Sequence, residues 1–260
     1  MLGMRPATVN SMKFLTRIPM TVTMIFALGA AAAWAAPVRV LILSGANNHD
    51  WHATTPVLKE TLESSGRFQV DVETNVPAMT AASFAPYDVL LSNFNFFGKK
   101  DAGPVWNADV RAAFVEFIRK GKGFVVVHSG SSVFYDWPEF QQLAGTSWGK
   151  HTSHGKIHTN EVRIVASHPI TEGLNPFTTF DEFWQGVDLA PGTTVLAEAT
   201  PLKEFGGSGK SEPMALVTKF GEGRGFTLLL GHNARAMESD GFKTLLRRGV
   251  EWAATGAVGK

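Results

Sequence analysis

The sequence predicts a single α/β domain in which helices flank an open, doubly wound and mostly parallel β-sheet. Over residues 38–129, apolar and helical segments follow one another in the order strand, helix, strand, strand, helix, strand. That order is typical of α/β folds. The strand segments include runs that are apolar throughout, such as GFVVV at 123–127. Such runs indicate a sheet that is covered on both faces.

The expected elements of the first half follow from local signals. Residues 38–44, 68–73 and 87–93 are expected strands, because they are rich in β-branched and other apolar residues. A first helix is expected to begin with Thr55 as its N-cap and Pro56 in its first turn, and to end near Gly66. A second helix is expected after Asn107, with one apolar face, followed by a strand at 123–129.

The second half is less regular. Short apolar runs predict further strands at 161–167, 193–199, 213–220 and 223–232, with a short helix at 138–145. Residues 239–256 are expected to form a closing amphipathic helix. No repeat or linker divides the chain, so one domain is expected over 37–260.

Residues 1–36 are expected to be a signal peptide. Lys13 and Arg17 precede an apolar stretch, and Ala33-Trp34-Ala35 fits the small-x-small pattern of a cleavage site. An uncleaved anchor helix is the alternative, although the stretch is short for a membrane span. We therefore expect a periplasmic or secreted protein that has no membrane attachment after cleavage.

Composition narrows the classes of function. The sequence has 24 basic and 23 acidic residues, and removing the three basic residues of 1–36 leaves 21 against 23. No basic patch interleaves with aromatic residues, so nucleic-acid binding has no support. Cysteine is absent, which excludes a thiol nucleophile and thiolate metal sites.

Polar residues follow three of the expected strands. His49 or His52 comes after the first strand, His128 after the fourth and His232 after the last. Because the carboxyl ends of parallel strands meet at one edge of a sheet, and ligands bind there, these histidines are expected to converge. A single histidine in such a place is more often only a surface or hydrogen-bonded group.

Two further segments add polar and aromatic side chains. Residues 147–158 contain three histidines in a glycine-containing sequence that is expected to form a lid-like loop; a solvated loop is the alternative. Asp181 and Glu182 are adjacent carboxylates that could orient an imidazole or act as a base. Trp51, Trp148 and Trp184 suit the apolar face of a sugar ring, with core packing as the alternative for each, and Trp51 and Trp148 are the expected sugar platform.

Several motifs together resemble the trehalose-utilisation (ThuA-like) family, and the resemblance covers about residues 38–255. They are SGANNHDW (44–51), GFVVVHSG (123–130), a Trp-Gly pair followed by histidine, ASHPITEGL (166–174), DEFW (181–184) and GRGFTLLLGH (223–232). The family resembles class I glutamine amidotransferase domains, and hence flavodoxin-like folds. Amidotransferases carry a cysteine nucleophile after the strand equivalent to GFVVV. Here His128-Ser129-Gly130 stands at that turn, which excludes a glutaminase.

The resemblance implies carbohydrate metabolism, and the expected function is acid–base chemistry on an oxidised (3-keto) sugar or glycoside. The expected catalytic residues are His128, His232, Glu182 and Asp50. The expected substrate-binding residues are His49, Trp51, Ser129, Gly130, Trp148, His154, Asp181 and Asn233.

Three alternatives stay open at this point. The histidine spacing lacks a compact metal-binding pattern on a helix. We therefore prefer a metal-free site and assign no cofactor. A site that binds a divalent metal ion is the alternative. A metal-dependent hydrolase and a non-catalytic carbohydrate-binding protein are the alternative functions. The expected partner is a small carbohydrate, and the sequence leaves a homo-oligomer open.

Overall fold

The computed structural model describes residues 1–3, 36–97 and 105–259. The apolar stretch and cleavage pattern of the expected signal peptide lie outside the described residues. The chain separates into residues 1–35 and a folded unit from residue 36 onward, and the folded unit is described by itself. No helix in the described ranges is long and apolar enough to cross a membrane.

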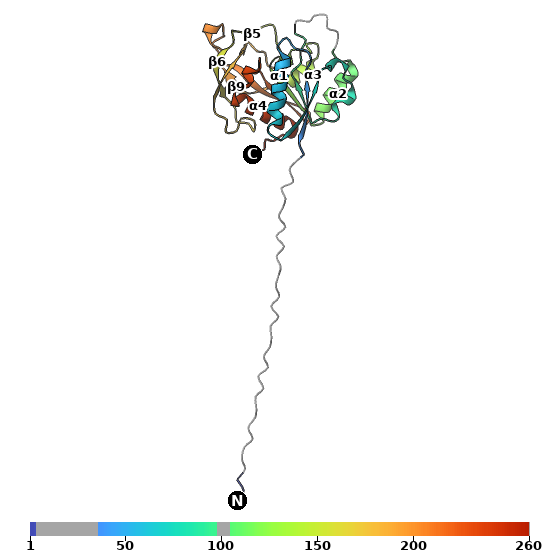
Figure 1. The fold of residues 1–260 in the computed structure, drawn as a ribbon, viewed down its shortest axis with the longest axis vertical. Helices are drawn as coiled ribbons and strands as arrows, with labels where there is room; N and C mark the ends of the chain where they lie inside the picture. The colour runs from blue at the N-terminus through green and yellow to red at the C-terminus, as the bar shows by residue number, and fades with distance from the viewer. Residues whose placement is uncertain (4–35, 98–104, 260) are drawn as a thin grey trace. The chain divides into compact units, whose positions relative to one another are not determined.

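A nine-stranded mixed sheet forms the centre of the folded unit, in the order β2-β1-β3-β4-β11-β10-β9-β6-β7 (Figure 1). Its strands are β1 (Val38–Leu43), β2 (Phe68–Glu73), β3 (Val89–Ser92), β4 (Gly123–Val127), β6 (His158–Ile164), β7 (Phe177–Asp181), β9 (Thr194–Ala199), β10 (Glu212–Phe220) and β11 (Gly223–Leu228). The run from β2 to β11 is parallel. The remaining strands extend the sheet as antiparallel neighbours.

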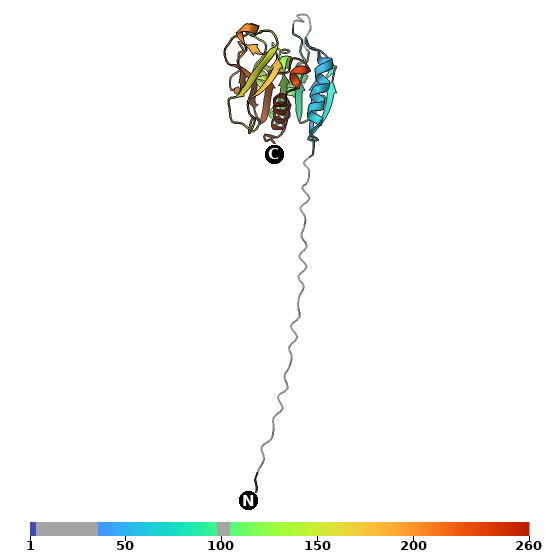
Figure 2. The same cartoon turned by 60° about the vertical axis from the view of Figure 1, so that its left-hand side comes forward.

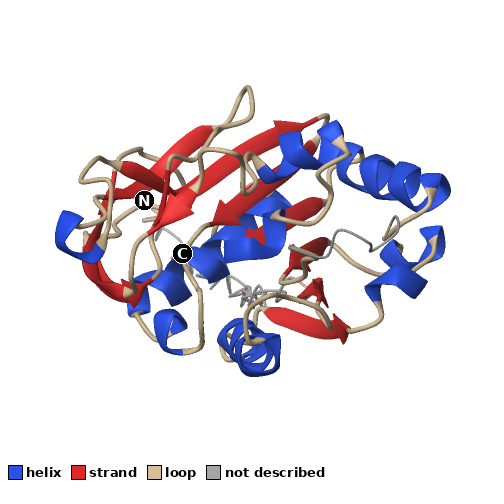
Figure 3. Cartoon of the chain, turned by 90° about the horizontal axis from the view of Figure 1, so that it is seen from above, coloured by secondary structure: helices blue, strands red, loops and turns tan. Residues whose placement is uncertain are grey.

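Helices cover both faces of the sheet, as Figure 3 shows. They are α1 (Trp51–Glu63), α2 (Ala108–Arg119), α3 (Pro138–Ala144) and α4 (Asp240–Thr255). Short 3₁₀ turns connect the elements: η1 (Val76–Ala78), η2 (Ala81–Phe84), η3 (His128–Ser131), η4 (Lys203–Phe205) and η5 (Arg235–Met237). This is the predicted doubly wound α/β domain.

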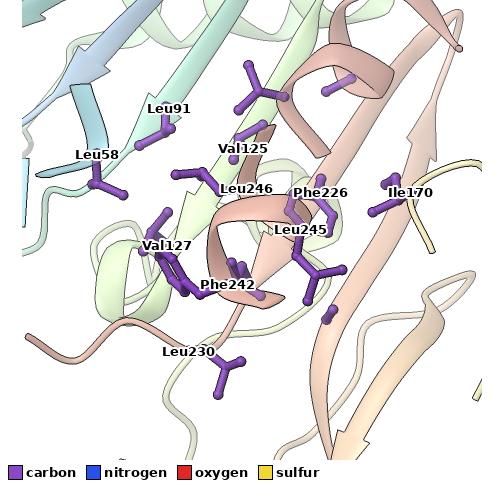
Figure 4. Close-up of a cluster of buried hydrophobic side chains, with 14 of the residues drawn as sticks. Leu58, Leu91, Val125, Val127, Ile170, Phe226, Leu230, Phe242, Leu245 and Leu246 are labelled. Atoms are coloured by element: carbon purple, nitrogen blue, oxygen red, sulfur yellow. The ribbon is translucent and has the colours of Figure 1, made fainter. Parts of the chain in front are cut away.

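Each central strand sends alternate side chains into two separate cores. In β4, Val125 and Val127 belong to the core under α1 and α4, whereas Phe124 and Val126 belong to the core under α2 and α3. Helices α1 and α4 lie next to each other on one face (Figure 2). Figure 4 shows Leu245 and Leu246 of α4 among the side chains of that core. Burial on both faces explains why these strands are continuously apolar.

The first helix begins earlier than the sequence signals indicated. Asp50, and not Thr55, is the N-cap of α1: its side chain accepts a hydrogen bond from the Ala53 backbone N–H at 3.1 Å. Thr55 is buried inside the helix and its hydroxyl lies 2.7 Å from the Ser44 hydroxyl. A threonine before a proline resembled a cap, but the available carboxylate five residues earlier satisfies the free N–H groups instead.

The antiparallel half contains strands that the sequence analysis missed. Strand β7 was not predicted, and neither was the separate two-stranded sheet of β5 (Ser153–His154) and β8 (Trp184–Gln185). These strands are short or partly polar, so their pattern gave little signal. They nevertheless fix both Glu182 and the 147–158 segment near the carboxyl ends of the parallel strands.

Replacing Gly249 with alanine is expected to lower the free energy of unfolding. Alanine has a higher helix propensity than glycine, which by itself would stabilise the helix by up to about 1 kcal/mol. However, its Cβ would lie 2.1 Å from the buried ring of Phe226 on β11, and overpacking of that kind costs about 1–3 kcal/mol. Urea denaturation should show a net loss of stability. The double variant Gly249→Ala/Phe226→Leu should lose less stability than the sum of the losses of the two single variants. Losses that add exactly would contradict this packing explanation.

Candidate active site

The turn after β4 holds the most unusual backbone conformation of the site. His128 has φ of +48° and is the one non-glycine residue with positive φ in the described part of the chain. A residue of this kind costs about 1–3 kcal/mol in backbone strain and persists where the surroundings over-determine it, often at functional sites. The turn thereby fixes the direction of the imidazole.

Both ring nitrogens of His128 have defined surroundings. Nδ1 lies 2.8 Å from the Leu229 carbonyl oxygen, and because a carbonyl only accepts, Nδ1 carries the proton. Nε2 points towards Glu182, with 3.5 Å to Oε1. No well-directed hydrogen bond reaches this buried Nε2 from the described residues, although the residue is only 2% exposed.

Three imidazoles meet at the edge of the sheet, as the parallel-strand argument predicted. The ring centroids of His49 and His128 are 4.9 Å apart, those of His49 and His232 are 4.5 Å apart, and those of His128 and His232 are 5.4 Å apart. The strands that precede these residues, β1, β4 and β11, belong to the parallel run. The predicted convergence is therefore confirmed.

A polar network holds His49 in place. Its Nδ1 lies 3.1 Å from Asn47 Oδ1 and 2.9 Å from Ser129 Oγ. The Asn95 amide donates to Asn47 Oδ1 at 2.8 Å and to Ser129 Oγ at 2.8 Å. Asn47 Oδ1 is thus an acceptor, which places the His49 proton on Nδ1 and leaves Nε2 with a free lone pair.

Glu182 is the centre of the site. Its Oε2 lies 3.2 Å from His154 Nδ1 and 3.4 Å from His232 Nδ1. Its Oε1 accepts a hydrogen bond from the Trp184 indole at 3.3 Å. The carboxylate therefore connects the buried histidines to His154, whose side chain is 43% exposed.

Asp181 is fully buried and does not line the pocket. It is 0% exposed. Its Oδ2 accepts from the Gly231 backbone N–H at 2.7 Å, and its Oδ1 accepts from the N–H groups of His232 at 3.1 Å and Glu182 at 2.8 Å. The side chain that was expected to bind substrate instead ties the end of β7 to the segment after β11, which positions Glu182 and His232.

The electrostatics divide the cluster into charged and neutral members. Burial, followed by the neighbouring His128 and His232, lowers the pKa of His49 to about 3, so this imidazole is neutral. Burial alone would raise the pKa of Glu182, but His128 and His232 lower it well below its usual range. Burial also opposes the charged form of His128, yet Glu182 and Asp181 outweigh it and raise its pKa.

A small pocket of about 70 Å³ opens above Glu182. Two groups of side chains line it, polar ones and aromatic ones: Asn48, His49, Ser129, Ser132, His154, Glu182, Phe97, Trp148 and Trp184. The Trp148 and Trp184 rings meet edge to face with centroids 5.0 Å apart. Aromatic walls beside polar groups suit a ligand with both apolar and hydroxyl-bearing faces.

Other expected site residues lie away from this pocket. Asp50 caps α1, and Trp51 stacks on His52 with centroids 3.6 Å apart. Asn233 accepts from the Ala236 N–H at 3.0 Å. None of the three lines the pocket.

Gly130 allows a close approach to the end of a neighbouring strand. A Cβ at this position would lie 2.2 Å from the Ser92 carbonyl oxygen at the end of β3. Ser129 contributes through its hydroxyl, which contacts His49. Of the three histidines in 147–158, only His154 contacts Glu182, because His151 is exposed and His158 is buried against Phe205.

Sequence reasoning missed Asn47, Asn95 and Phe97 as parts of the site. The signal for the asparagines was present, since Asn47 and Asn95 lie in the polar segments that follow β1 and β3. Their role depends on hydrogen bonds between segments far apart in the chain, which no local pattern shows.

Four side chains of the site also have the composition of a metal centre. His49, His128, Glu182 and His232 each offer one donor atom, and these atoms all lie within 4.8 Å of one another. Three imidazoles and a carboxylate are common ligands of divalent transition metals.

Comparison with solved structures places this geometry in context. A ThuA-like protein from Parabacteroides merdae matches with 29% identity and a TM-score of 0.76, covering 86% of this chain and 92% of the other. A ThuA-like protein from Bacteroides uniformis matches with 17% identity and a TM-score of 0.63, covering 88% and 98%. A glutamine amidotransferase from Thermotoga maritima matches with 16% identity and a TM-score of 0.52, covering 84% and 98%.

The sheet order and the turn after β4 define a glutamine amidotransferase-like α/β protein that has no cysteine nucleophile. The model of one family, ThuA, described as trehalose utilisation, matches residues 39–253. The chain belongs to the ThuA family. No curated protein matches it in sequence.

Proposed function

We propose that the protein is an exported carbohydrate-processing enzyme that acts on an oxidised (3-keto) sugar or glycoside by acid–base chemistry. The observation that carries this proposal is the pocket in which Glu182 and two imidazoles face Trp148 and Trp184. Membership of a family described as trehalose utilisation supports a carbohydrate substrate. The signal-peptide pattern of residues 1–36 supports export to the periplasm or beyond.

A ketone on a sugar ring makes the hydrogen on the adjacent carbon acidic, so proton transfer there is the step to catalyse. His154 is the pocket-lining imidazole that contacts Glu182 through Nδ1, at 3.2 Å. The Gly155 carbonyl oxygen lies 2.9 Å from the same Nδ1. Both the carbonyl and the carboxylate accept, so Nδ1 carries the proton and the other nitrogen is free to accept one. We assign His154 as the proton-transfer group and Glu182 as the group that orients it.

His128 and His232 have a supporting place in this proposal. Both approach Glu182 from the protein side, at 3.5 Å and 3.4 Å, and neither lines the pocket. They would keep the carboxylate ionised and correctly oriented. Ser129 and Asn48 line the pocket and supply hydrogen-bonding groups for hydroxyls of the sugar.

A panel of native and 3-keto glycosides tests the proposal directly. The purified protein should convert keto glycosides and leave their unoxidised counterparts unchanged, as followed by chromatography of the products. Parallel reactions with a chelator would separate metal-dependent from metal-free chemistry. Binding of a carbohydrate by calorimetry without any turnover would instead support the non-catalytic binding protein.

Substitution of Trp148 by alanine is expected to raise the KM for the converted glycoside about tenfold, because loss of roughly 1.4 kcal/mol of stacking corresponds to that factor. The value of kcat should change less, since the indole does not transfer protons. Steady-state kinetics measure both constants. Tyr87→Ala, which removes an aromatic side chain just before β3, at the opposite end of the parallel strands from the site, is the matched control and should leave KM unchanged. Equal KM values for both variants would contradict a sugar platform at Trp148.

A further inference from the structure

We propose that His49, His128, Glu182 and His232 bind a divalent transition-metal ion, with Zn²⁺ as the representative ion. The argument does not depend on which substrate the pocket accepts. It rests on the spacing of the donor atoms, on buried nitrogens without partners, and on the hydrogen bonds that fix the ring tautomers.

The spacing of the donors matches a coordination shell. Zinc binds imidazole nitrogen and carboxylate oxygen at about 2.0–2.2 Å, so neighbouring ligands of a tetrahedral ion lie about 3.4 Å apart. The distance from Glu182 Oε1 to His128 Nε2 is 3.5 Å, and that from Glu182 Oε2 to His232 Nδ1 is 3.4 Å. All four donors lie within 4.8 Å of one another, so side-chain movements of about 1 Å would complete the shell.

Two of the donor atoms have no hydrogen-bond partner among the described residues. His128 Nε2 and His232 Nδ1 are buried and make no well-directed hydrogen bond in the described structure. A buried polar atom left in that condition costs about 1–3 kcal/mol. A cation between them and Glu182 would satisfy both nitrogens at once and would balance the charge of the carboxylate.

The surroundings of His128 and His49 prepare them as ligands. Metal-binding histidines usually donate their second N–H to a carbonyl or another acceptor, which fixes the tautomer and the orientation of the ring. His128 Nδ1 donates to the Leu229 carbonyl at 2.8 Å, and His49 Nδ1 lies 3.1 Å from Asn47 Oδ1. Each ring therefore keeps a proton on Nδ1 and leaves Nε2 for the cluster, where a metal ion would replace any proton on Nε2.

The donor set selects the class of ion. Mg²⁺ and Ca²⁺ prefer shells of oxygen atoms, whereas imidazole nitrogen suits zinc, iron, copper and nickel. Three nitrogens and one oxygen thus favour a first-row transition metal. Because His49 and Glu182 also line the pocket, the bound ion would lie at its base, next to any ligand.

Sequence spacing favoured a metal-free site, because the four ligands come from four separate segments. The competing arrangement is a proton shared between His128 and Glu182 without any metal. The two arrangements predict opposite results when the purified protein is stripped with a chelator and then dialysed against Zn²⁺ or Mg²⁺.

Stripped protein should take up one Zn²⁺ per chain, measured by equilibrium dialysis and elemental analysis, and should not take up Mg²⁺ at the same concentration. Zinc should also raise the midpoint of thermal unfolding, since an ion that binds only the folded state stabilises it. Glu182→Gln, which keeps the shape of the side chain, should weaken Zn²⁺ binding by more than about a hundredfold, the upper end of the loss seen for supporting residues.

Two further variants sharpen the test. Ser129→Ala removes a hydroxyl that contacts His49 and should weaken Zn²⁺ binding by about tenfold, as loss of a supporting hydrogen bond does. His52→Ala removes an exposed imidazole three residues after His49 in the sequence and should have no effect. The proposal is wrong if stripped protein binds no Zn²⁺, or if Glu182→Gln binds it as tightly as the unmodified chain. Loss of binding in His52→Ala would also overturn it, by pointing to a surface site. None of these measurements requires a substrate, so their outcome is independent of the carbohydrate assay.

Discussion

Replacing Asp181 with alanine is expected to lower the free energy of unfolding by about 3 kcal/mol, because each unsatisfied buried N–H group costs about 1–3 kcal/mol. The carboxylate accepts hydrogen bonds from the backbone of Gly231, His232 and Glu182. Loss of all three partners exceeds the gain from removing a carboxylate whose pKa is raised by burial. Equilibrium denaturation by urea measures the difference.

The matched control is Glu172→Ala, which removes an exposed carboxylate from the connection between β6 and β7. Surface substitutions of this kind usually change stability by less than about 0.5 kcal/mol. Equal stability of Asp181→Ala and Glu172→Ala would contradict the structural role of Asp181.

Glu182→Gln is expected to lower kcat/KM on a converted keto glycoside by about 10²–10⁴-fold, the usual contribution of a positioned acid–base group. The amide keeps the size of the side chain but carries no charge, so it neither orients His154 by charge nor holds an ion. Steady-state kinetics supply the measurement. His154→Ala should give a loss of similar size.

Thermal unfolding separates a catalytic effect from a folding defect in these variants. Glu182→Gln should remain folded, because it replaces one polar side chain by another of the same shape. Full activity of both Glu182→Gln and His154→Ala would show that the proton transfer takes place elsewhere. Loss of activity in His154→Ala with unchanged zinc binding would separate proton transfer from metal binding.

Much of the fold was predictable because its signals are local. The apolar runs of β1, β3, β4 and β11 and the helix periodicity of α2 and α4 appear within short windows of sequence. The antiparallel strands β5, β7 and β8 were not predicted, because they are short and contain polar residues. The predicted start of α1 was wrong, because both Asp50 and Thr55 have side chains that can act as an N-cap, and Asp50 is the one that does so.

The site was predictable in part. Convergence of His49, His128 and His232 followed from the rule that parallel strands end at one edge, and the ring distances confirm it. The separate tasks of Asp181 and Glu182 were not predictable, since adjacent carboxylates look alike in sequence. One is buried under three backbone N–H groups and the other lines the pocket.

The sequence by itself determined the α/β domain, the absence of a cysteine nucleophile and the histidines at the strand ends, because residue type and local periodicity determine these properties. Only the tertiary structure decided that His128 lies next to Glu182, that His154 is the one histidine of its segment that reaches the site, and that Asp50 and Trp51 lie outside the pocket. Those positions depend on contacts between segments that are distant in the chain. Packing of the whole domain sets such contacts, and no short stretch of sequence encodes them.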